Sequence, residues 1–303
     1  MISPVVSEAR PLLTDVTERP GQSYWSQSWE RLRANRIGMA CGALILVLAA
    51  IALAAPLIST SLTHFAYSDQ DLTHIFRPPS ATHWLGTDEL GRDTLTRLVY
   101  GARISLTVGF LTVGLSLAAG ATVGLIAGYY GGWVDNVLMR LVDTLLSIPS
   151  IFLFILLSIL LRPNAVTLSM IIAIVGWGNV ARLVRAETLS IKTRDFITAT
   201  RSIGARDVRL IVRHLLPNAL PVMIVAASLA VGQIILVEAA LSYLGLGIQP
   251  PTPSWGNMLS NAQQYFYHSV YLVIFPGVCI FVTVLAANIF GNSVRDAFDP
   301  RLK

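Results

Sequence analysis

The residue types that usually carry catalysis are sparse in this chain of 303 residues, and they stand far apart. Its two lysines, Lys192 and Lys303, do not follow a glycine, so the chain has no glycine-rich loop ending in the lysine that holds nucleotide phosphates. No two of its five histidines are three to five residues apart, as a zinc site on one helix would require, and no G-x-S-x-G nucleophile motif is present. The sequence therefore predicts no catalytic residue, no metal site and no cofactor, which disfavours a membrane-embedded enzyme.

Glu238 is the ionisable residue deepest in an apolar stretch, where an unpaired carboxylate is costly. One interpretation is that Glu238 and Ser242 line a water-filled translocation path. The alternative, which we favour, places Glu238 near the outer membrane interface, solvated or hydrogen-bonded to a neighbouring helix. Arg140 and Asp143, three residues apart at the start of another apolar stretch, are expected to form a structural pair.

The stretch Asp195–Asn218 (DFITATRSIGARDVRLIVRHLLPN) is charged and amphipathic, and it separates two long apolar runs. Its spacing predicts two short helices joined by a bend at Gly204, a residue type that often ends helices. Pro217 is expected to stop the second helix. On local spacing alone, the stretch could equally be a basic amphipathic loop lying on lipid. Two apolar faces carry the pattern: Phe196, Ala199, Thr200, Ile203 in the first helix and Val208, Ile211, Val212, Leu215 in the second.

The composition indicates an integral membrane protein, because 54% of the residues are apolar and only 13% are charged. A membrane-spanning helix needs roughly 20 mostly apolar residues. Six runs approach that length: Ile37–Leu57, Ile104–Gly128, Val137–Leu161, Ala165–Ala181, Ala219–Leu244 and Val270–Ile289. The predicted fold is an all-α integral membrane protein with six transmembrane helices, and Pro149, Pro221 and Pro276 are expected to be tolerated or to kink them.

Small residues recur every four positions along the second run, from Thr112 and Ser116 to Gly120, Gly124 and Gly128. Such a stripe lets another helix approach closely. Close helix packing is the favoured interpretation, and lining of a pathway is the alternative.

The distribution of basic residues predicts the orientation in the membrane. If the N-terminus is cytoplasmic, fifteen Lys and Arg residues of the loops and tail ends lie on the cytoplasmic side and five, including Arg162, lie outside. Positive charge accumulates on the cytoplasmic side of membrane proteins, so both termini and Asp195–Asn218 are predicted to be cytoplasmic. The uncharged connection Gly245–Ser269 is then predicted to lie outside.

Five segments resemble one protein family. TATRSIGARDVRLIVRHLLPN resembles the EAA loop of the membrane subunits of ABC importers, with Gly204 and Leu216-Pro217 at the required separation. The chain from about residue 80 onward is similar to the C-type permeases for dipeptides, oligopeptides and nickel. Four further segments carry this similarity: HWLGTDELGRDTLTRLVYGARISL, AGYYGGWVDNVLMRLVDTLLSIPS, LSYLGLGIQPPTPSWGNML and RDAFDPRL. The sequence departs from the family where it has Thr198-Ala199-Thr200 in place of E-A-A, which leaves the position-198 carboxylate missing, and His214 replaces an isoleucine.

The resemblance implies the fold of an ABC importer permease, in which the Asp195–Asn218 stretch docks as a coupling helix on a separate ATPase. A bacterial inner-membrane location follows, with a second, B-type permease subunit, one or two ATPase subunits and a substrate-binding protein as partners. The implied contact residues for the ATPase are Phe196, Thr198, Ala199, Thr200, Ile203, Gly204, Ala205 and Arg206. The implied organisation is a cytoplasmic tail over 1–36, a first transmembrane helix over 37–58, an extracytoplasmic loop with an interfacial helix over 59–103, a permease core over 104–293 with its coupling loop at 182–218, and a cytoplasmic tail over 294–303.

The extracytoplasmic segment Thr87–Arg103 is expected to form an amphipathic helix on the membrane surface. Its DELGRD residues, Asp88, Glu89, Arg92 and Asp93, could receive the binding protein, although a solvated interfacial face is the simpler expectation. Peptides are the default cargo that the resemblance implies, and nickel or another small solute is the alternative. From a different class, an ion-coupled secondary transporter would need inverted repeats and several buried ionisable groups, and only Glu238 lies deep enough.

Overall fold

The computed structural model describes residues 24–161 and 163–299, and the described chain is built of α-helices with one isolated β-bridge between Thr87 and Asp93. The predicted tail residues 1–23, Arg162 and the terminal residues 300–303 lie outside the described residues. The helices are α1 (Tyr24–Ala34), α2 (Arg36–Leu53), α3 (Ala55–Ile58), α4 (Thr94–Tyr130), α5 (Gly132–Ser147), α6 (Ser150–Leu161), α7 (Ala165–Lys192), α8 (Asp195–Ser202), α9 (Asp207–Leu210), α10 (Leu216–Tyr243), α11 (Trp255–Met258), α12 (Ala262–Tyr265) and α13 (Tyr271–Phe298), with π-helical segments η1 (Ser59–Thr63) and η2 (Ile211–Leu215).

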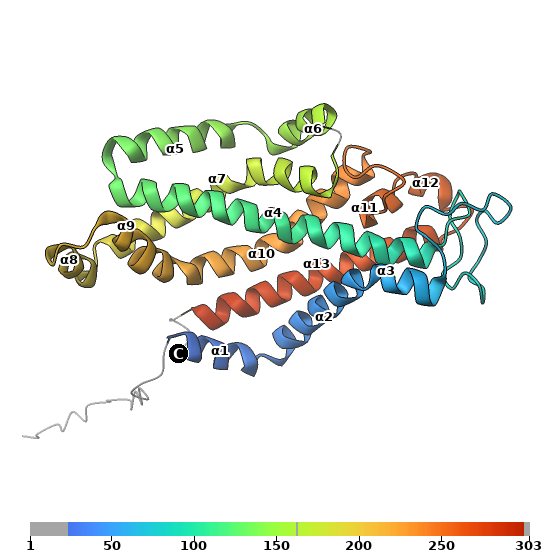
Figure 1. Cartoon of the computed structure of the whole chain (residues 1–303), viewed down its shortest axis with the longest axis horizontal. Helices are drawn as coiled ribbons and strands as arrows, with labels where there is room; N and C mark the ends of the chain where they lie inside the picture. The colour runs from blue at the N-terminus through green and yellow to red at the C-terminus, as the bar shows by residue number, and fades with distance from the viewer. Residues whose placement is uncertain (1–23, 162, 300–303) are drawn as a thin grey trace, which may run out of the picture.

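The long helices run roughly side by side along the molecule (Figure 1). Helices suit a bilayer because they satisfy their own backbone hydrogen bonds where no water is present. Among the described residues, five helices are long and apolar enough to cross a membrane, and the α5–α6 pair makes six if it is counted as one span. The all-α membrane fold predicted from composition is thus confirmed.

The third predicted span is not a continuous helix, which corrects the expectation for Val137–Leu161. The chain bends by 83° between α5 and α6. Ile148 there is extended, with φ −86° and ψ 126°. The physical reason is Pro149, which lacks an N–H and disfavours helical geometry in the residue before it. In the same region, Asp143 pairs with Arg182 of α7 at 2.6 Å, so the predicted pairing of Asp143 with Arg140 is replaced by a contact between helices.

Helices α4 and α7 pack along the small-residue stripe of α4. A Cβ atom added to Gly124 would lie 2.6 Å from the Ala181 carbonyl oxygen and 2.8 Å from the Val184 Cβ. Gly120 and Gly128 meet α7 in the same way. The favoured interpretation of the stripe, close helix packing, is confirmed over its glycine half.

Pro217 does not end the second helix of the Asp195–Asn218 stretch. The helix passes through the π-helical segment η2 and continues as α10, with Pro217 in the first turn. A proline is tolerated inside this continuous helix because the π turn directly before it shifts the hydrogen bonds, with the Leu216 N–H donating to the Ile211 carbonyl oxygen five residues back. The second helix of this stretch and the fifth predicted span therefore form one continuous helix, Asp207–Tyr243.

Residues 94–103 are not a separate interfacial helix but the first turns of α4, which corrects the expectation for Thr87–Arg103. Residues 87–93 form a tight loop closed by the Thr87–Asp93 bridge. The Asp93 carboxylate accepts a hydrogen bond from the Thr96 backbone at 2.8 Å and thereby caps the N-terminus of α4. Long connections gather at this end of the bundle, whereas α8, α9, α1 and the end of α13 lie at the opposite end (Figure 1).

Candidate functional site

The stretch around Gly204 forms a short helix, a bend and a second helix, as its spacing predicts. Helix α8 is followed by Ile203 at its C-cap and by Gly204 with φ +84°. This left-handed geometry is costly for residues with a Cβ, although the space around Gly204 is open. The bend thus depends on backbone freedom and not on close packing.

The buried side of this stretch is anchored in the bundle. Ile197, Leu210 and Leu215 are fully buried, in a cluster with Leu125 of α4 and Ile191 of α7. Leu215 belongs to the second apolar set predicted from the sequence, whereas Ile197 and Leu210 belong to neither set, because they lie on other faces of their helices.

The predicted ATPase-contact face points away from the bundle. Ile203 is 85% exposed and Phe196 is 39% exposed. The remaining candidates divide into exposed Thr198, Ala199, Gly204 and Arg206 and partly buried Thr200 and Ala205. An exposed apolar face made of Phe196, Ala199 and Ile203 along one short helix is what a docking partner requires, and nothing in the described chain covers it.

Tyr129, at the end of α4, ties the bend to the bundle. Its hydroxyl donates to the Asp207 carboxylate at 2.5 Å. The Arg201 guanidinium lies 5.5 Å from the centre of the Tyr129 ring, and Lys192 donates to the Tyr129 carbonyl oxygen. The sequence does not indicate a role for Tyr129, because Tyr129 lies 78 residues from Asp207 and no local spacing connects the two residues. Tyr129 therefore links α8 and the start of α9 to α4, in addition to the links to α7 and α10 through the buried cluster.

Glu238 and Ser242 lie in the interior at the other end of α10, not on a path. Both side chains are buried, and the Glu238 carboxylate accepts hydrogen bonds at 2.8 Å from the hydroxyls of Ser242 and of Ser105 on α4. The two residues are not among those that line the larger cavities described below. The structure therefore corrects the path interpretation and agrees with the alternative of hydrogen bonding to a neighbouring helix.

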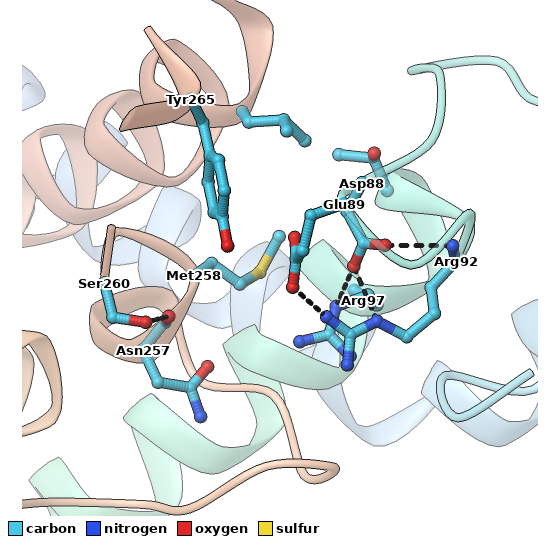
Figure 2. Close-up of a pocket in the computed structure, with 10 residues that line it drawn as sticks. Asp88, Glu89, Arg92, Arg97, Asn257, Met258, Ser260 and Tyr265 are labelled. Atoms are coloured by element: carbon cyan, nitrogen blue, oxygen red, sulfur yellow. Dashed lines mark hydrogen bonds and ion pairs between the residues drawn. The ribbon is translucent and has the colours of Figure 1, made fainter. Parts of the chain in front are cut away.

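Asp88, Glu89 and Arg92 of the DELGRD segment turn inward, around a small cavity of about 30 Å³ (Figure 2). Arg92 binds Asp88 at 2.7 Å and Glu89 at 2.5 Å, and Arg97 approaches Asp88 at 3.2 Å. Burial, and then the charge of Asp88, raise the pKa of Glu89. Asp88, Arg92 and Asp93 are buried, so these three neither present a surface to a binding protein nor form a solvated interfacial face. Glu89 alone of the four keeps partial exposure.

A cavity of about 250 Å³ lies between α4, α7 and α10. Its lining is apolar apart from Thr112, Ser116, Asn179 and Gln233, and none of its lining residues is charged. A wider cavity of about 960 Å³ adjoins it, with Leu183 and Ala226 lining both. The wider cavity reaches Arg194, directly before α8, and Asn218 at the start of α10. Only Thr112 and Ser116 of this polar set were singled out in the sequence, as part of the small-residue stripe.

Comparison with protein families decides the assignment. Residues 120–303 match the family described as "Binding-protein-dependent transport system inner membrane component", and residues 23–79 match the "N-terminal TM domain of oligopeptide transport permease C". The chain belongs to this permease family. It is therefore an integral membrane protein that crosses the inner membrane several times, as an inner-membrane component of a transport system.

Curated relatives of this permease extend over nearly its whole length. The dipeptide transport system permease protein DppC of Alkalihalophilus pseudofirmus is 40% identical and covers 97% of this chain and 98% of its own. The glutathione transport system permease protein GsiD of Pectobacterium atrosepticum is 38% identical, and the match covers 97% of this chain and 95% of GsiD. The oligopeptide transport system permease protein OppC of Bacillus subtilis is 37% identical, and the match covers 93% of this chain and 91% of OppC.

A solved structure shares the fold of the permease. An inward-facing form of the MetNI methionine ABC transporter superposes with a TM-score of 0.53 and 23% identity, covering 67% of this chain and 97% of the matched chain. The family resemblance inferred from the sequence segments is thus confirmed by the family match, the curated relatives and the fold.

Proposed function

We propose that this permease is the non-catalytic C-type subunit of an ATP-driven importer that carries di- and oligopeptides across the bacterial inner membrane. A B-type permease would complete the path, a separate ATPase would supply energy, and a binding protein would deliver the cargo from outside. Relatives named for dipeptide, oligopeptide and glutathione transport support a peptide cargo, since glutathione is itself a peptide. Both termini and α8 would face the cytoplasm.

The exposed apolar face of α8, which is anchored to three spans, carries this proposal. Closure of an ATPase dimer would press on Phe196, Ala199 and Ile203. The push would pass through Ile197 and Tyr129 into the bundle and rock the helices between two orientations. The departure from E-A-A at Thr198 removes a carboxylate from this surface and leaves the bend at Gly204 intact.

The test is a reconstituted complex with both permeases, the ATPase and the binding protein, in which labelled dipeptide uptake and ATP hydrolysis are measured together. Gly204→Val is expected to leave assembly intact and to lower peptides moved per ATP roughly tenfold, because a β-branched residue resists positive φ. Gly204→Asn is the matched control, since asparagine tolerates this geometry, and it should retain coupling.

Ala199→Asp is expected to act in the same direction by placing a charge in the docking face, while Ala199→Ser should be tolerated. Full uptake by both Gly204→Val and Ala199→Asp would refute the docking role. Competition of dipeptide uptake by glutathione and by nickel in the same assay separates the cargo alternatives. Transport by the purified chain without an ATPase would instead support an ion-coupled carrier.

A further inference from the structure

Two amide side chains lie exposed near the middle of membrane-spanning helices. Asn179 is near the centre of α7, and Gln233 lies within α10. Both are exposed on the surface of the described chain, and neither has a hydrogen-bond partner among the described residues. Both line the cavity of about 250 Å³ between α4, α7 and α10.

Lipid is a poor environment for these amides. An amide placed in hydrocarbon without a hydrogen bond is strongly disfavoured, and polar groups inside membrane spans face a water-filled cavity or a polar partner. The buried hydroxyl of Ser116 lines the same cavity and has no hydrogen-bond partner in the described structure. Three unpaired polar groups from three different helices therefore converge on one space.

The geometry of the adjoining cavity indicates water and cargo as the occupants. The wider cavity leads from the shared residues Leu183 and Ala226 to Arg194, at the end of the bundle that carries α8. Toward the opposite end, α11 packs against α4 and α10 with Trp255 buried. The two cavities together therefore extend toward the end of the bundle that carries α8, as the path of a transporter must on at least one side.

We propose that Ser116, Asn179 and Gln233 form this chain's share of a polar station that hydrogen-bonds the peptide backbone of passing cargo. This inference rests on the proposed peptide-import function. An amide side chain offers one acceptor and two donors, the complement of a backbone carbonyl and N–H. Because none of the lining residues is charged, the station recognises what all peptides share and does not select their side chains.

Uptake by amide variants in the reconstituted complex tests this role. Asn179→Leu and Gln233→Leu are each expected to lower peptide uptake roughly threefold to tenfold, the value of one lost hydrogen bond, with ATPase stimulation by the binding protein retained. Asn179→Gln should keep most of the activity. Thr122→Val is the matched control, because the Thr122 hydroxyl bonds within its own helix, to the Ala118 carbonyl oxygen, and should leave uptake unchanged.

Thiol labelling distinguishes a water-filled path from a contact with another subunit. In a background with Cys41 and Cys279 replaced by alanine, Asn179→Cys and Gln233→Cys should react with a water-soluble methanethiosulfonate in inside-out vesicles, and saturating dipeptide should slow the reaction. Ile174→Cys, on the exposed apolar surface of α7, should stay unreactive.

Unreactive cysteines at 179 and 233, or leucine variants with unchanged uptake, would overturn the polar station while leaving the importer proposal standing. A wild-type complex that moves no peptide would instead refute the importer proposal itself.

Discussion

Glu238 organises the connection that follows α10 through two serines. The backbone N–H of Trp255 donates to the Ser105 hydroxyl, and the N–H of Ile248 donates to the Ser242 hydroxyl. Each serine in turn donates to one carboxylate oxygen of Glu238. The buried acid thus fixes two points of the uncharged connection that follows α10. This arrangement gives Glu238 a structural reason to lie in an apolar helix.

Removing the Glu238 carboxylate is expected to destabilise the permease. Glu238→Leu leaves two buried serine hydroxyls without an acceptor, at a cost of about 2–4 kcal/mol in the free energy of unfolding. Glu238→Gln keeps one acceptor oxygen and should cost less. The difference in stability is measured by heating the purified permease in detergent and using size-exclusion chromatography to determine the fraction that remains folded at each temperature. Equal midpoints for the glutamine and leucine variants would contradict the assignment.

The sequence could locate Glu238 but not its surroundings. An acid in an apolar run signals a special position, and Ser242 four residues later lies on the same helix face. Ser105 is 133 residues away, so only the tertiary fold brings it to the carboxylate. The same limit explains why Asn179 and Gln233 were not singled out. A lone amide in a span has no spacing pattern, and its meaning appears only when three helices bring unpaired polar groups to one cavity.

At the scale of helices, local patterns predicted the elements well where backbone chemistry is decisive. The four-residue period of small residues marked one side of the α4–α7 contact, although nothing in it named α7 as the partner. Gly204 marked a real bend because positive φ favours glycine. Pro217 and Pro149 were harder to interpret, since a proline either starts, bends or ends a helix depending on its neighbours. Pro217 lies within a continuous rod, and Pro149 separates two helices.

Tyr129 links two elements, and its hydroxyl should matter for coupling more than for folding. Tyr129→Phe removes the hydrogen bond to Asp207 and leaves the aromatic ring beneath Arg201. Peptides moved per ATP are expected to fall roughly twofold to tenfold, the effect of one typical intramolecular hydrogen bond. Tyr130→Phe is the matched control, because Tyr130 is the adjacent residue and its ring is half exposed. Identical coupling in both variants would show that the bend moves independently of α4.

The whole molecule has two unlike ends. One carries α8, the wider cavity and the contact between α1 and the end of α13, where the Tyr24 hydroxyl donates to the Phe298 carbonyl oxygen at 2.7 Å. The other carries α11, α12 and the buried ion pairs of Asp88 and Arg92 (Figures 1 and 2). Since the described parts of both termini lie at the same end of the bundle as α8, one orientation measurement assigns all of them to the same side of the membrane.

The charge distribution predicts which side that is. The end that carries α8 holds most of the basic residues, and the positive-inside rule places it in the cytoplasm. In a background without Cys41 and Cys279, Tyr267→Cys should react with a membrane-impermeant maleimide in intact spheroplasts, because Tyr267 is 89% exposed near α12. Ser202→Cys, exposed at the end of α8, should react only after the membrane is opened. The reverse pattern would place the apolar face of α8 outside the cell, where no ATP-hydrolysing partner could reach it, and the importer mechanism would fail with it.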